Sequence, residues 1–301
     1  MKLVECVPNF SEGRDKEVVN QIADAIKINE HVKILDIEMD PDHNRSVITF
    51  VSPVEYAVEA AFNGIKKASE LIDMDKHKGA HPRFGAADVV PFVPIFDTTM
   101  EECVKLAWEL GERVGNELKI PVYLYEKAAK VEWRRNLADI RNESFQYEQL
   151  KEHIKEDKWK PDFGPSEVGK AGATIIGARE FLIAFNVNLN TNDVKIAKNI
   201  AKSIREKTGS FKNVRALGFE LKERNMVQVS MNLLNYKETP IYRVYEAIKL
   251  EAEKYGVTVA EAEVVGLVPL DALVDALKVY MRLRSFKSDQ VFENKLLGAL
   301  I

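Results

Sequence analysis

Two similar stretches decide the fold: Ser52-Pro-Val-Glu-Tyr-Ala-Val-Glu-Ala60 and Thr239-Pro-Ile-Tyr-Arg-Val-Tyr-Glu-Ala247. In each stretch, a hydroxyl residue that can cap a helix stands before a proline, and proline is favoured at the first helical position. We therefore expect one helix to begin at Ser52-Pro53 and another at Thr239-Pro240. Because the two stretches also match along their length, they indicate a duplicated structure.

A second pair of matches follows these helices: Asp88-Val-Val-Pro-Phe-Val-Pro94 in the first half and Glu263-Val-Val-Gly-Leu-Val-Pro269 in the second. Both are apolar enough to be strands, and apolar periodicity along the rest of each half predicts the order strand, helix, strand, strand, helix, strand. The expected strands are residues 4–7, 32–37, 46–51, 89–95, 181–189, 214–221, 226–233 and 262–268, and the other expected helices are residues 16–28 and 193–206.

This order predicts an α/β (α+β) protein made of two similar, ferredoxin-like βαββαβ subdomains. We expect the subdomains to cover residues 1–178 and 179–301. The length of 301 residues suits two domains of ordinary size.

The first copy carries an additional segment between its second helix and its last strand. The matched alanine and the matched acidic residue are 28 positions apart in the first copy and 16 in the second, which leaves 12 additional residues. The segment lies within Asp75-Lys-His-Lys-Gly-Ala-His-Pro-Arg-Phe-Gly-Ala-Ala-Asp88, a polar loop with glycines before a strand. A duplicated unit can stay folded while one copy gains a functional loop, so this loop is predicted to be functional.

His81 is the best candidate for chemistry in this loop, because imidazole titrates near neutrality. A lone histidine is more often structural, but a position in the additional segment beside Arg83 favours a function. By the same test, His77 is expected to be a surface residue. The two histidines have the i, i+4 spacing of a helical metal pair, yet Gly79 between them and Pro82 after them argue against a helix. No metal site is therefore predicted.

Two other segments could bring polar groups together. Asp36-Ile-Glu-Met-Asp-Pro-Asp-His-Asn-Arg45 is either a cation site, although it lacks EF-hand spacing, or a turn that leaves Asn44 and Arg45 able to bind an anion. The glycine-dense segment of residues 164–179, whose first part, residues 164–172, we call the connector, is neither a P-loop nor a dinucleotide fingerprint. It is either an interdomain linker or a backbone-lined wall against a flat ligand.

Two strands of the second half have an unusual polar face, since amide and hydroxyl residues alternate with apolar ones there. A solvated face more usually carries Lys and Glu, so this face is expected either to cover a ligand or the other half, or to be an ordinary exposed face. The polar positions are Asn186, Asn188, Asn190, Gln228, Ser230 and Asn232.

Composition narrows the class of protein further. The net charge of −4 does not favour nucleic-acid binding, so an anionic ligand would need a local positive pocket. Cys6 and Cys103 lie in apolar stretches and are expected to be reduced core residues rather than a disulfide or zinc ligands. The sequence has neither a signal peptide nor an apolar run long enough to cross a bilayer, which predicts a cytoplasmic protein.

With these segments assembled, the chain resembles the glutamate formimidoyltransferase (formiminotransferase) family, in the monofunctional form that lacks a cyclodeaminase domain. The matches are collinear over the whole length and are therefore far more specific than any short motif. They are residues 4–13, Asn44-Arg45, 71–74, 77–83, 121–125, 161–165, 177–186 and 265–269.

The resemblance implies two similar subdomains whose sheets face each other across a ligand tunnel, with His81 as the catalytic base. It implies a second catalytic role for Glu38, where animal members have aspartate, so that the longer side chain is a departure. The implied substrate-binding residues are Asn9, Asn44, Arg45, Arg83 and Arg179. The implied folate-binding residues are Gly164, Pro165, Ser166, Glu167, Val168, Gly169, Lys170, Ala171 and Gly172, in a connector shorter and more polar than that of the animal members.

The implied reaction moves a formimidoyl group from N-formimidoyl-L-glutamate to N5 of tetrahydrofolate, in histidine degradation and one-carbon metabolism. Tetrahydrofolate would be a co-substrate, and no metal is implied. One imidazole could remove the proton from N5 and return it to the departing nitrogen, which is typically worth about 10²–10⁴-fold. The family also implies a homodimer without nucleic-acid or membrane partners. Two alternatives stay open: formyl transfer between N-formylglutamate and tetrahydrofolate, and a folate-binding protein without catalysis.

Overall fold

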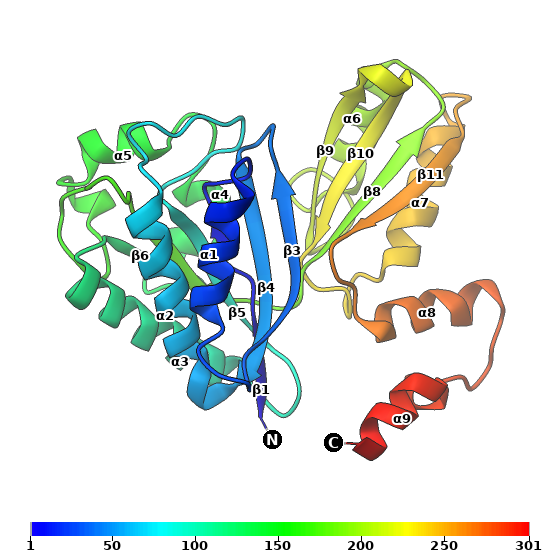
Figure 1. The fold of residues 1–301 in the computed structure, drawn as a ribbon. Helices are drawn as coiled ribbons and strands as arrows, with labels where there is room; N and C mark the ends of the chain where they lie inside the picture. Colours follow the sequence, from blue (N-terminus) through cyan, green and yellow to red (C-terminus); the bar gives the residue numbers. More distant parts are fainter. Residues whose placement is uncertain (1, 301) are drawn as a thin grey trace. The chain divides into compact units, whose positions relative to one another are not determined.

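The computed structural model describes residues 2–300, and the chain separates into two compact units, Met1–Glu180 and Phe181–Ile301 (Figure 1). Each unit has its own sheet, its own helices and its own apolar core. The predicted α/β class with two α+β parts is confirmed.

The first unit is built on a mixed sheet in which β1 and β2 are two pieces of one interrupted strand, both lying between β4 and β5. The neighbours across the sheet run β3, β4, β1/β2, β5, β7, β6. Only the last two pairings, β5 with β7 and β7 with β6, are parallel. The strands are β1 (Leu3–Cys6), β2 (Asn9–Phe10), β3 (Lys33–Asp40), β4 (Arg45–Pro53), β5 (Ala87–Pro94), β6 (Val122–Glu126) and β7 (Thr174–Ala178).

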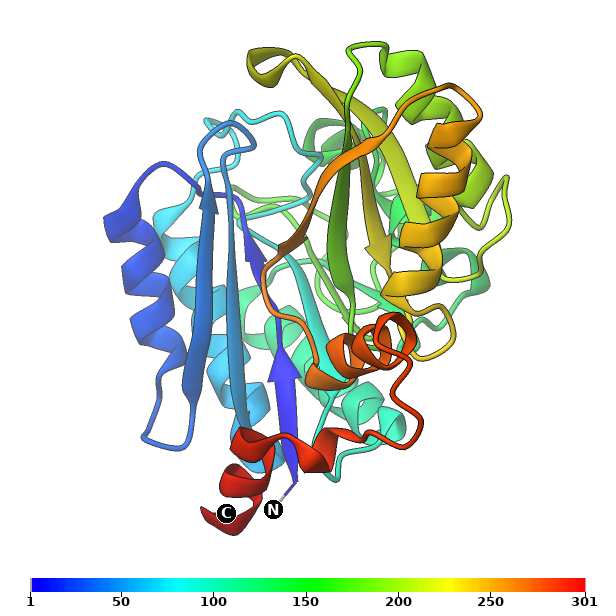
Figure 2. The same ribbon diagram turned by 90° about the vertical axis from the view of Figure 1, so that its right-hand side faces the viewer.

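Three long helices pack in the core of the first unit: α1 (Lys16–Ile26) lies beside α2 (Val54–Leu71), and α3 (Met100–Arg113) packs on β5, β6 and β7 (Figures 1 and 2). The start of α1 is fixed by Asp15, whose side chain accepts from the backbone N–H groups of Glu17 and Val18. The apolar stripe of α1 is buried, as its spacing predicts. Shorter helical segments follow: η1 (Val114–Leu118), η2 (Glu132–Arg135), α4 (Leu137–Ile140), α5 (Tyr147–His153) and η3 (Asp157–Trp159).

Side chains alternate across this sheet, and the alternation places the polar residues on one face. Val4 and Cys6 of β1 and Phe10 of β2 are buried in the main apolar core. The residues between them in the alternation, Glu5 and Asn9, therefore point to the opposite face. We call the face opposite this core the second face of the sheet.

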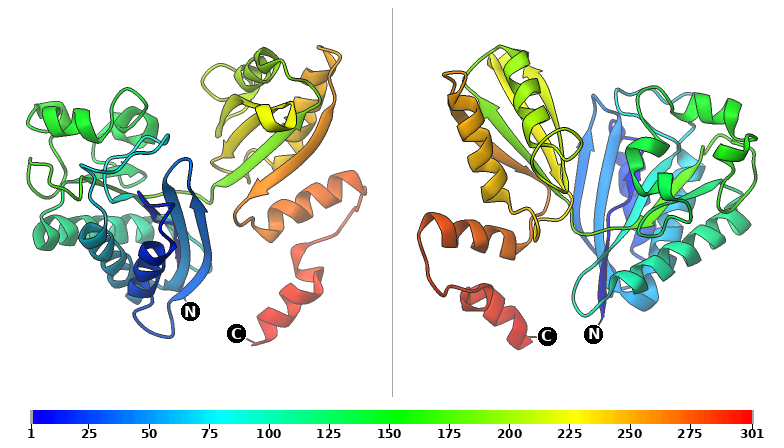
Figure 3. Two further views of the ribbon diagram at one scale, coloured as in Figure 1. Left: turned by 45° about the horizontal axis from the view of Figure 1, so that its top comes forward. Right: turned by 180° about the vertical axis from the view of Figure 1, so that it is seen from behind.

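The second unit is a four-stranded antiparallel sheet with neighbours in the order β11, β8, β10, β9. Helices α6 and α7 pack against it, as Figure 3 shows. The apolar sides of β8 and β10 are buried, whereas the amide side carries a ladder of hydrogen bonds in which Gln228 donates to Asn188 at 3.0 Å and Asn188 donates to Glu261 at 2.8 Å. The elements are β8 (Ile183–Leu189), α6 (Val194–Ile204), β9 (Val214–Leu221), η4 (Lys222–Arg224), β10 (Met226–Leu233), α7 (Ile241–Glu253), β11 (Val259–Val265), α8 (Leu270–Tyr280), η5 (Ser288–Gln290) and α9 (Phe292–Leu300).

The predicted duplication is confirmed at the level of element order, and the β9–β10 hairpin has the predicted bounds. The predicted helix caps are wrong by one residue. Pro53 and Pro240, not Ser52 and Thr239, occupy the cap positions, and neither helix has a side-chain cap. The reason is that β4 continues through Pro53, while the Thr239 hydroxyl donates to the carbonyl of Lys212 at 2.8 Å.

The connector at residues 164–172 is not an interdomain linker, because it runs inside the first unit and leads into the buried strand β7. Gly172 has φ +74° and pairs with Gly85, and a Cβ on Gly172 would lie 2.2 Å from the carbonyl oxygen of Phe84. Glycine is required at this crossing for both reasons. The connector is therefore fixed to the loop that carries His81.

Candidate functional site

The candidate site is a small pocket in the first unit, where the loop between α2 and β5 meets the turn between β3 and β4. This loop, residues 72–86, contains most of the stretch 75–88 in which the sequence places the additional segment; the corresponding loop of the second unit covers only residues 254–258. The pocket is lined by Phe10, Ser11, His43, Asn44, Arg45, His77, His81, Arg83 and Asp88.

In this pocket, the imidazole of His81 contacts the guanidinium of Arg45. Its Nε2 lies 3.3 Å from Nη1 of Arg45, and the other terminal nitrogen of Arg45 donates to the side-chain oxygen of Asn9. Since an arginine N–H can only donate, the contact identifies Nε2 as the unprotonated ring nitrogen. Three of the predicted site residues are thus brought together by β2, β4 and the long loop.

The environment keeps the His81 imidazole neutral. Burial is the largest cause that lowers its pKa, followed by the charges of Arg45 and Arg141, and together they bring the pKa to about 3. The ring is therefore available to accept a proton at neutral pH. The same cations oppose the imidazolium form, so an anion bound in the pocket would make proton uptake easier.

The guanidinium of Arg45 is itself withdrawn from solvent. Burial lowers the pKa of its guanidinium to about 10, although the Asp88 carboxylate opposes this effect. Its Nε is buried and has no hydrogen-bond partner within the part of the chain that the structure describes. Because an unsatisfied buried donor is costly, a bound carboxylate or carbonyl would be stabilised here.

Asn44 fixes the turn against the loop rather than facing open space. It has φ +48°, a conformation that asparagine tolerates, and its side chain accepts from the Gly13 N–H and donates to the Lys78 carbonyl, both at 3.0 Å. The two segments also touch at Gly79, where a Cβ would lie 2.1 Å from the carbonyl oxygen of His43. The predicted substrate contact of Asn44 stays a prediction beside this structural role.

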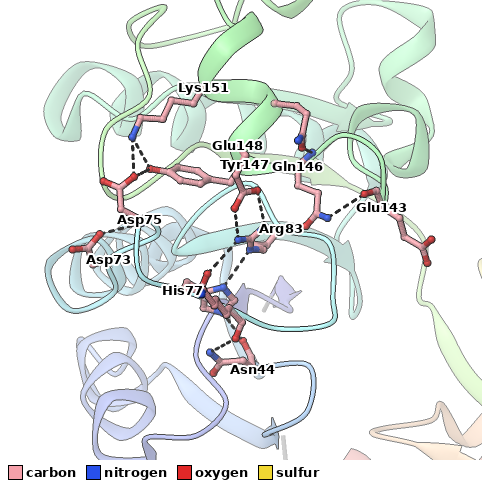
Figure 4. Close-up of polar contacts among 12 residues, drawn as sticks. Asn44, Asp73, Asp75, His77, Arg83, Glu143, Gln146, Tyr147, Glu148 and Lys151 are labelled. Carbon is pink, nitrogen blue, oxygen red and sulfur yellow. Dashed lines mark hydrogen bonds and ion pairs between the residues drawn. The ribbon is translucent and has the colours of Figure 1, made fainter.

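Arg83 is held by a dense set of contacts that tie the loop to α5 (Figure 4). Its guanidinium donates to both carboxylate oxygens of Glu148 at 2.7 and 2.9 Å and to Gln146 at 2.9 Å. It also donates to the ring and to the carbonyl of His77, both at 3.2 Å. These five contacts match the five N–H groups of arginine, so this arrangement leaves none for a substrate carboxylate.

The expectation that His77 is a surface residue is wrong. Its Nδ1 accepts from Arg83, and its Nε2 lies 2.9 Å from the carbonyl oxygen of Asn44. Burial lowers the pKa of His77, which agrees with a neutral ring that donates through Nε2. The His77 ring therefore links Arg83 by hydrogen bonds to Asn44, in the turn next to Arg45 (Figure 4).

Glu38 lies on β3 opposite Val47 of β4, and so on the second face of the sheet near Arg45. Burial, followed by repulsion from Asp36, raises the pKa of its carboxyl group, while Arg45 opposes the rise. A carboxylate and an imidazole thus flank one guanidinium. The pair has the residue types that acid–base chemistry needs.

Arg179 lies in another part of the second face. Its backbone N–H donates to the carbonyl of Phe92, three residues along β5 from Val89, which pairs with Asn9. A strand rises about 3.3 Å per residue, so Arg179 is roughly 10 Å along the sheet from the row that holds Asn9. The structure therefore separates Arg179 from the other predicted substrate-binding residues.

The predicted folate-binding connector approaches the site from the N-terminal ends of β5 and β7. Its backbone is fixed by hydrogen bonds from Met74 to the Lys170 carbonyl and from Ala86 to the Ala171 carbonyl, both 2.8 Å. Gly164, Glu167, Gly169 and Lys170 are exposed, whereas Val168 is buried. The connector thus offers exposed backbone and one lysine beside the loop that carries His81.

Sequence reasoning missed three residues that shape the pocket: His43, Asp88 and Arg141. The His43 ring packs edge-on against His81, with the ring centres 6.2 Å apart, and its Nδ1 lies 2.5 Å from the Asp40 carboxylate. Arg141 forms a buried ion pair with Asp88 at 3.2 Å and also donates to the carbonyl of Pro82. His43 lies in the acidic segment already singled out, but nothing in the sequence pointed to Arg141.

Among residues 2–300, no group of three His, Cys, Asp or Glu side chains is arranged to hold a metal ion. Over the same residues, every helix is too short or too polar to cross a membrane.

A half-buried neutral imidazole beside an arginine, on an α/β scaffold, has the residue types of an acid–base site for an anionic ligand. Residues 3–179 match the N-terminal subdomain of the formiminotransferase domain, and residues 184–296 match the formiminotransferase domain. The chain belongs to the formiminotransferase family.

Relatives that match along the chain carry the corresponding names. A glutamate formimidoyltransferase of Thermoplasma acidophilum is 64% identical over 98% of each chain, and one of Streptococcus pyogenes serotype M1 is 46% identical over 99% of each. The formimidoyltransferase-cyclodeaminase of Rattus norvegicus is 46% identical over 93% of this chain, which corresponds to 52% of that protein.

Proposed function

We propose that this enzyme transfers the formimidoyl group of N-formimidoyl-L-glutamate to N5 of tetrahydrofolate, which gives 5-formimidoyltetrahydrofolate and L-glutamate. Membership of the family and the names of the full-length relatives support the proposal. The observation that carries it is the half-buried, neutral His81 with Arg45 at its Nε2.

In this proposal, N5 attacks the trigonal carbon of the formimidoyl group and forms a tetrahedral intermediate. N5 must lose a proton, and the nitrogen of the departing glutamate must gain one. His81 Nε2 accepts the first proton and returns it to the leaving nitrogen, so that the imidazole ends neutral as it began. Bringing two bound substrates together supplies much of the remaining acceleration.

The charges near His81 fit both substrates. Carboxylates of the glutamyl groups suit Arg45, whose buried Nε has no protein partner among the described residues. The formimidoyl group is a protonated amidine at neutral pH, and a carboxylate such as Glu38 would stabilise it. A formyl group carries no such charge, so Glu38 beside Arg45 favours the formimidoyl donor over N-formylglutamate.

Tetrahydrofolate is the proposed co-substrate, with the connector at residues 164–172 as its contact. Support comes from the exposed backbone of Gly169 and from Lys170, which lies near the carboxylate of Asp73 at 3.9 Å. No metal has a role in the proposed steps. The homodimer and the cytoplasmic location stay predictions; sedimentation of the purified protein would test the first.

The test is to follow absorbance of the folate product with tetrahydrofolate and either donor, for the wild-type enzyme and for His81→Ala. We expect turnover of N-formimidoyl-L-glutamate and a loss of about 10²–10⁴-fold in the variant. Preference for N-formylglutamate would identify a formyl transferase instead. Tight folate binding without turnover of either donor would favour the non-catalytic alternative.

Two controls separate chemistry from folding. His31→Ala removes an exposed histidine that stacks on Tyr56 outside the pocket, and it should keep full turnover. Thermal unfolding and tetrahydrofolate binding of His81→Ala should match the wild type. A folded His81→Ala variant with near-normal turnover would overturn the assignment of the base.

A further inference from the structure

Glu5 is a buried carboxylate that the proposed reaction does not use. It lies on β1 with only 4% of its surface exposed, and its side chain points to the second face between Val51 and Val93 of the neighbouring strands. Within residues 2–300, no hydrogen bond and no ion pair within 4 Å ends on this carboxylate. A charged group in such a place is costly unless a partner satisfies it.

The cation that acts on Glu5 is Arg179, which lowers the pKa of the carboxyl group from beyond ion-pair distance. Arg179 is itself oriented: one terminal nitrogen donates to the carbonyl of Glu180 at 2.9 Å, and the guanidinium also donates to the hydroxyl oxygen of Tyr125. Tyr125 is buried over Gly177, where a Cβ would collide with its ring. The result is a buried, unpartnered acceptor on the same face as an oriented donor, with valines of the two neighbouring strands beside the acceptor.

We propose that Glu5 and Arg179 bind the pyrimidine edge of a reduced pterin, with Glu5 accepting from the 2-amino group and N3–H and Arg179 donating to the 4-oxo group. The edge of this ring presents two donors followed by one acceptor, which is the complement of a carboxylate beside a guanidinium. A glutamyl tail would instead bring carboxylates against Glu5, which would repel them. Valine side chains beside Glu5 suit a flat ring.

The position along the sheet agrees with this assignment, which rests on the proposed function. Val93, the partner of Glu5, is four residues from Val89, the partner of Asn9, and therefore about 13 Å away along β5. Glu5 stands at one end of this interval, and Asn9, whose side-chain oxygen accepts from Arg45, stands at the other. The fused pterin ring has its 2-amino group at one end and N5 in the other ring, so it can contact Glu5 while N5 approaches His81.

Calorimetric binding of two fragments tests the proposal without turnover. The first is 6-methyltetrahydropterin, which has the ring without the tail, and the second is p-aminobenzoylglutamate, which has the tail without the ring. Glu5→Gln should weaken binding of the pterin at least tenfold, because it replaces two charge-assisted acceptors, and should leave the tail fragment within twofold. Glu112→Gln, an exposed change on α3, should alter neither.

Two results would overturn the proposal: pterin affinity unchanged in Glu5→Gln, or a loss confined to p-aminobenzoylglutamate, which would assign the pair to the tail. If Glu5→Gln does not fold, Glu5→Asp is the second variant. It keeps the carboxylate but moves it away from the pterin by one methylene group, and the same loss of pterin affinity is expected. Failure of the proposed function can be told apart from failure of this proposal. In that case the wild-type enzyme would not turn over N-formimidoyl-L-glutamate, while pterin binding would still depend on Glu5.

Discussion

Nη1 of Arg45 lies 3.3 Å from Nε2 of His81, so a permanent cation faces the nitrogen that accepts the proton in the proposed reaction. The contact has two opposite effects on the imidazole. It orients the ring and fixes the neutral tautomer, and it also opposes protonation, since burial and the charges of Arg45 and Arg141 bring the pKa of His81 to about 3. Anionic substrates that bind to Arg45 would reduce the second effect while keeping the first.

Replacing Arg45 with glutamine should shift the pH dependence of the free enzyme. Loss of the nearest cation raises the pKa of His81 toward its ordinary value, so the protonated, inactive imidazole persists to higher pH. The acidic limb of kcat/KM should therefore move to higher pH, and KM for the anionic donor should rise. The measurement is a pH profile of kcat/KM, which reports groups of the free enzyme.

Arg113→Gln is the matched control for this experiment, since it removes an arginine on α3 that pairs with Glu59 and Glu117 outside the pocket. Its acidic limb should coincide with that of the wild type. An unshifted limb in Arg45→Gln would show that Arg45 does not control the protonation of His81.

Arg83→Lys should destabilise the loop and lower kcat, because lysine cannot reproduce the five-donor fork that holds Glu148, Gln146 and His77. The loss of these partly buried hydrogen bonds should cost about 1–3 kcal/mol in the free energy of unfolding, measured with urea. Glu148→Gln should cost less, because its side chain is 54% exposed.

The same variants decide between two roles for Arg83. A positioning role predicts that stability and kcat fall together, with a smaller change in KM. The substrate-binding role that the sequence predicts would instead raise KM for the anionic donor and leave urea unfolding unchanged.

Much of the fold follows from the sequence, because each half repeats one order of apolar periods. The hairpin at residues 214–221 and 226–233 alternates strictly, and its bounds are predicted correctly. The helix caps at Pro53 and Pro240 are missed by one residue, because hydrogen bonds elsewhere in the fold, rather than local preference, decide where the strand ends.

The site was predictable only where its residues share a segment or a family motif. His81, Asn44 and Arg45 belong to matched motifs, and the structure brings the three into one pocket. Arg141 and Glu148 come from a part of the chain that carries no motif, and only tertiary contacts bring them to the loop. Likewise, the alternation of a strand predicts the face of the sheet on which Glu5 lies. It does not predict that the carboxylate has no partner there, because that depends on tertiary contacts.

Glu5 should make stability depend on pH in the direction opposite to a salt-bridged carboxylate. Burial is the main cause that raises its pKa to about 7 in the folded protein, against 4.5 as the ordinary value, while Arg179 opposes the rise. Between pH 4.5 and 7 the folded state therefore holds this proton more tightly than the unfolded chain. The contribution of Glu5 to the free energy of unfolding is favourable below pH 4.5 and is lost as pH rises through 7.

Glu5→Gln removes this ionisation, so the variant should gain stability relative to the wild type as pH rises from 4.5 to 7, and the gain should stay constant above. A gain of up to about 3 kcal/mol is expected, since one pKa unit corresponds to about 1.4 kcal/mol. The measurement is urea unfolding at several pH values, with the exposed Glu55→Gln on α2 as the control that should show no such trend. Curves for Glu5→Gln and wild type that stay parallel across this range would show that Glu5 ionises normally. Added 6-methyltetrahydropterin should stabilise the wild type more than the variant, because its N–H donors would satisfy the Glu5 carboxylate.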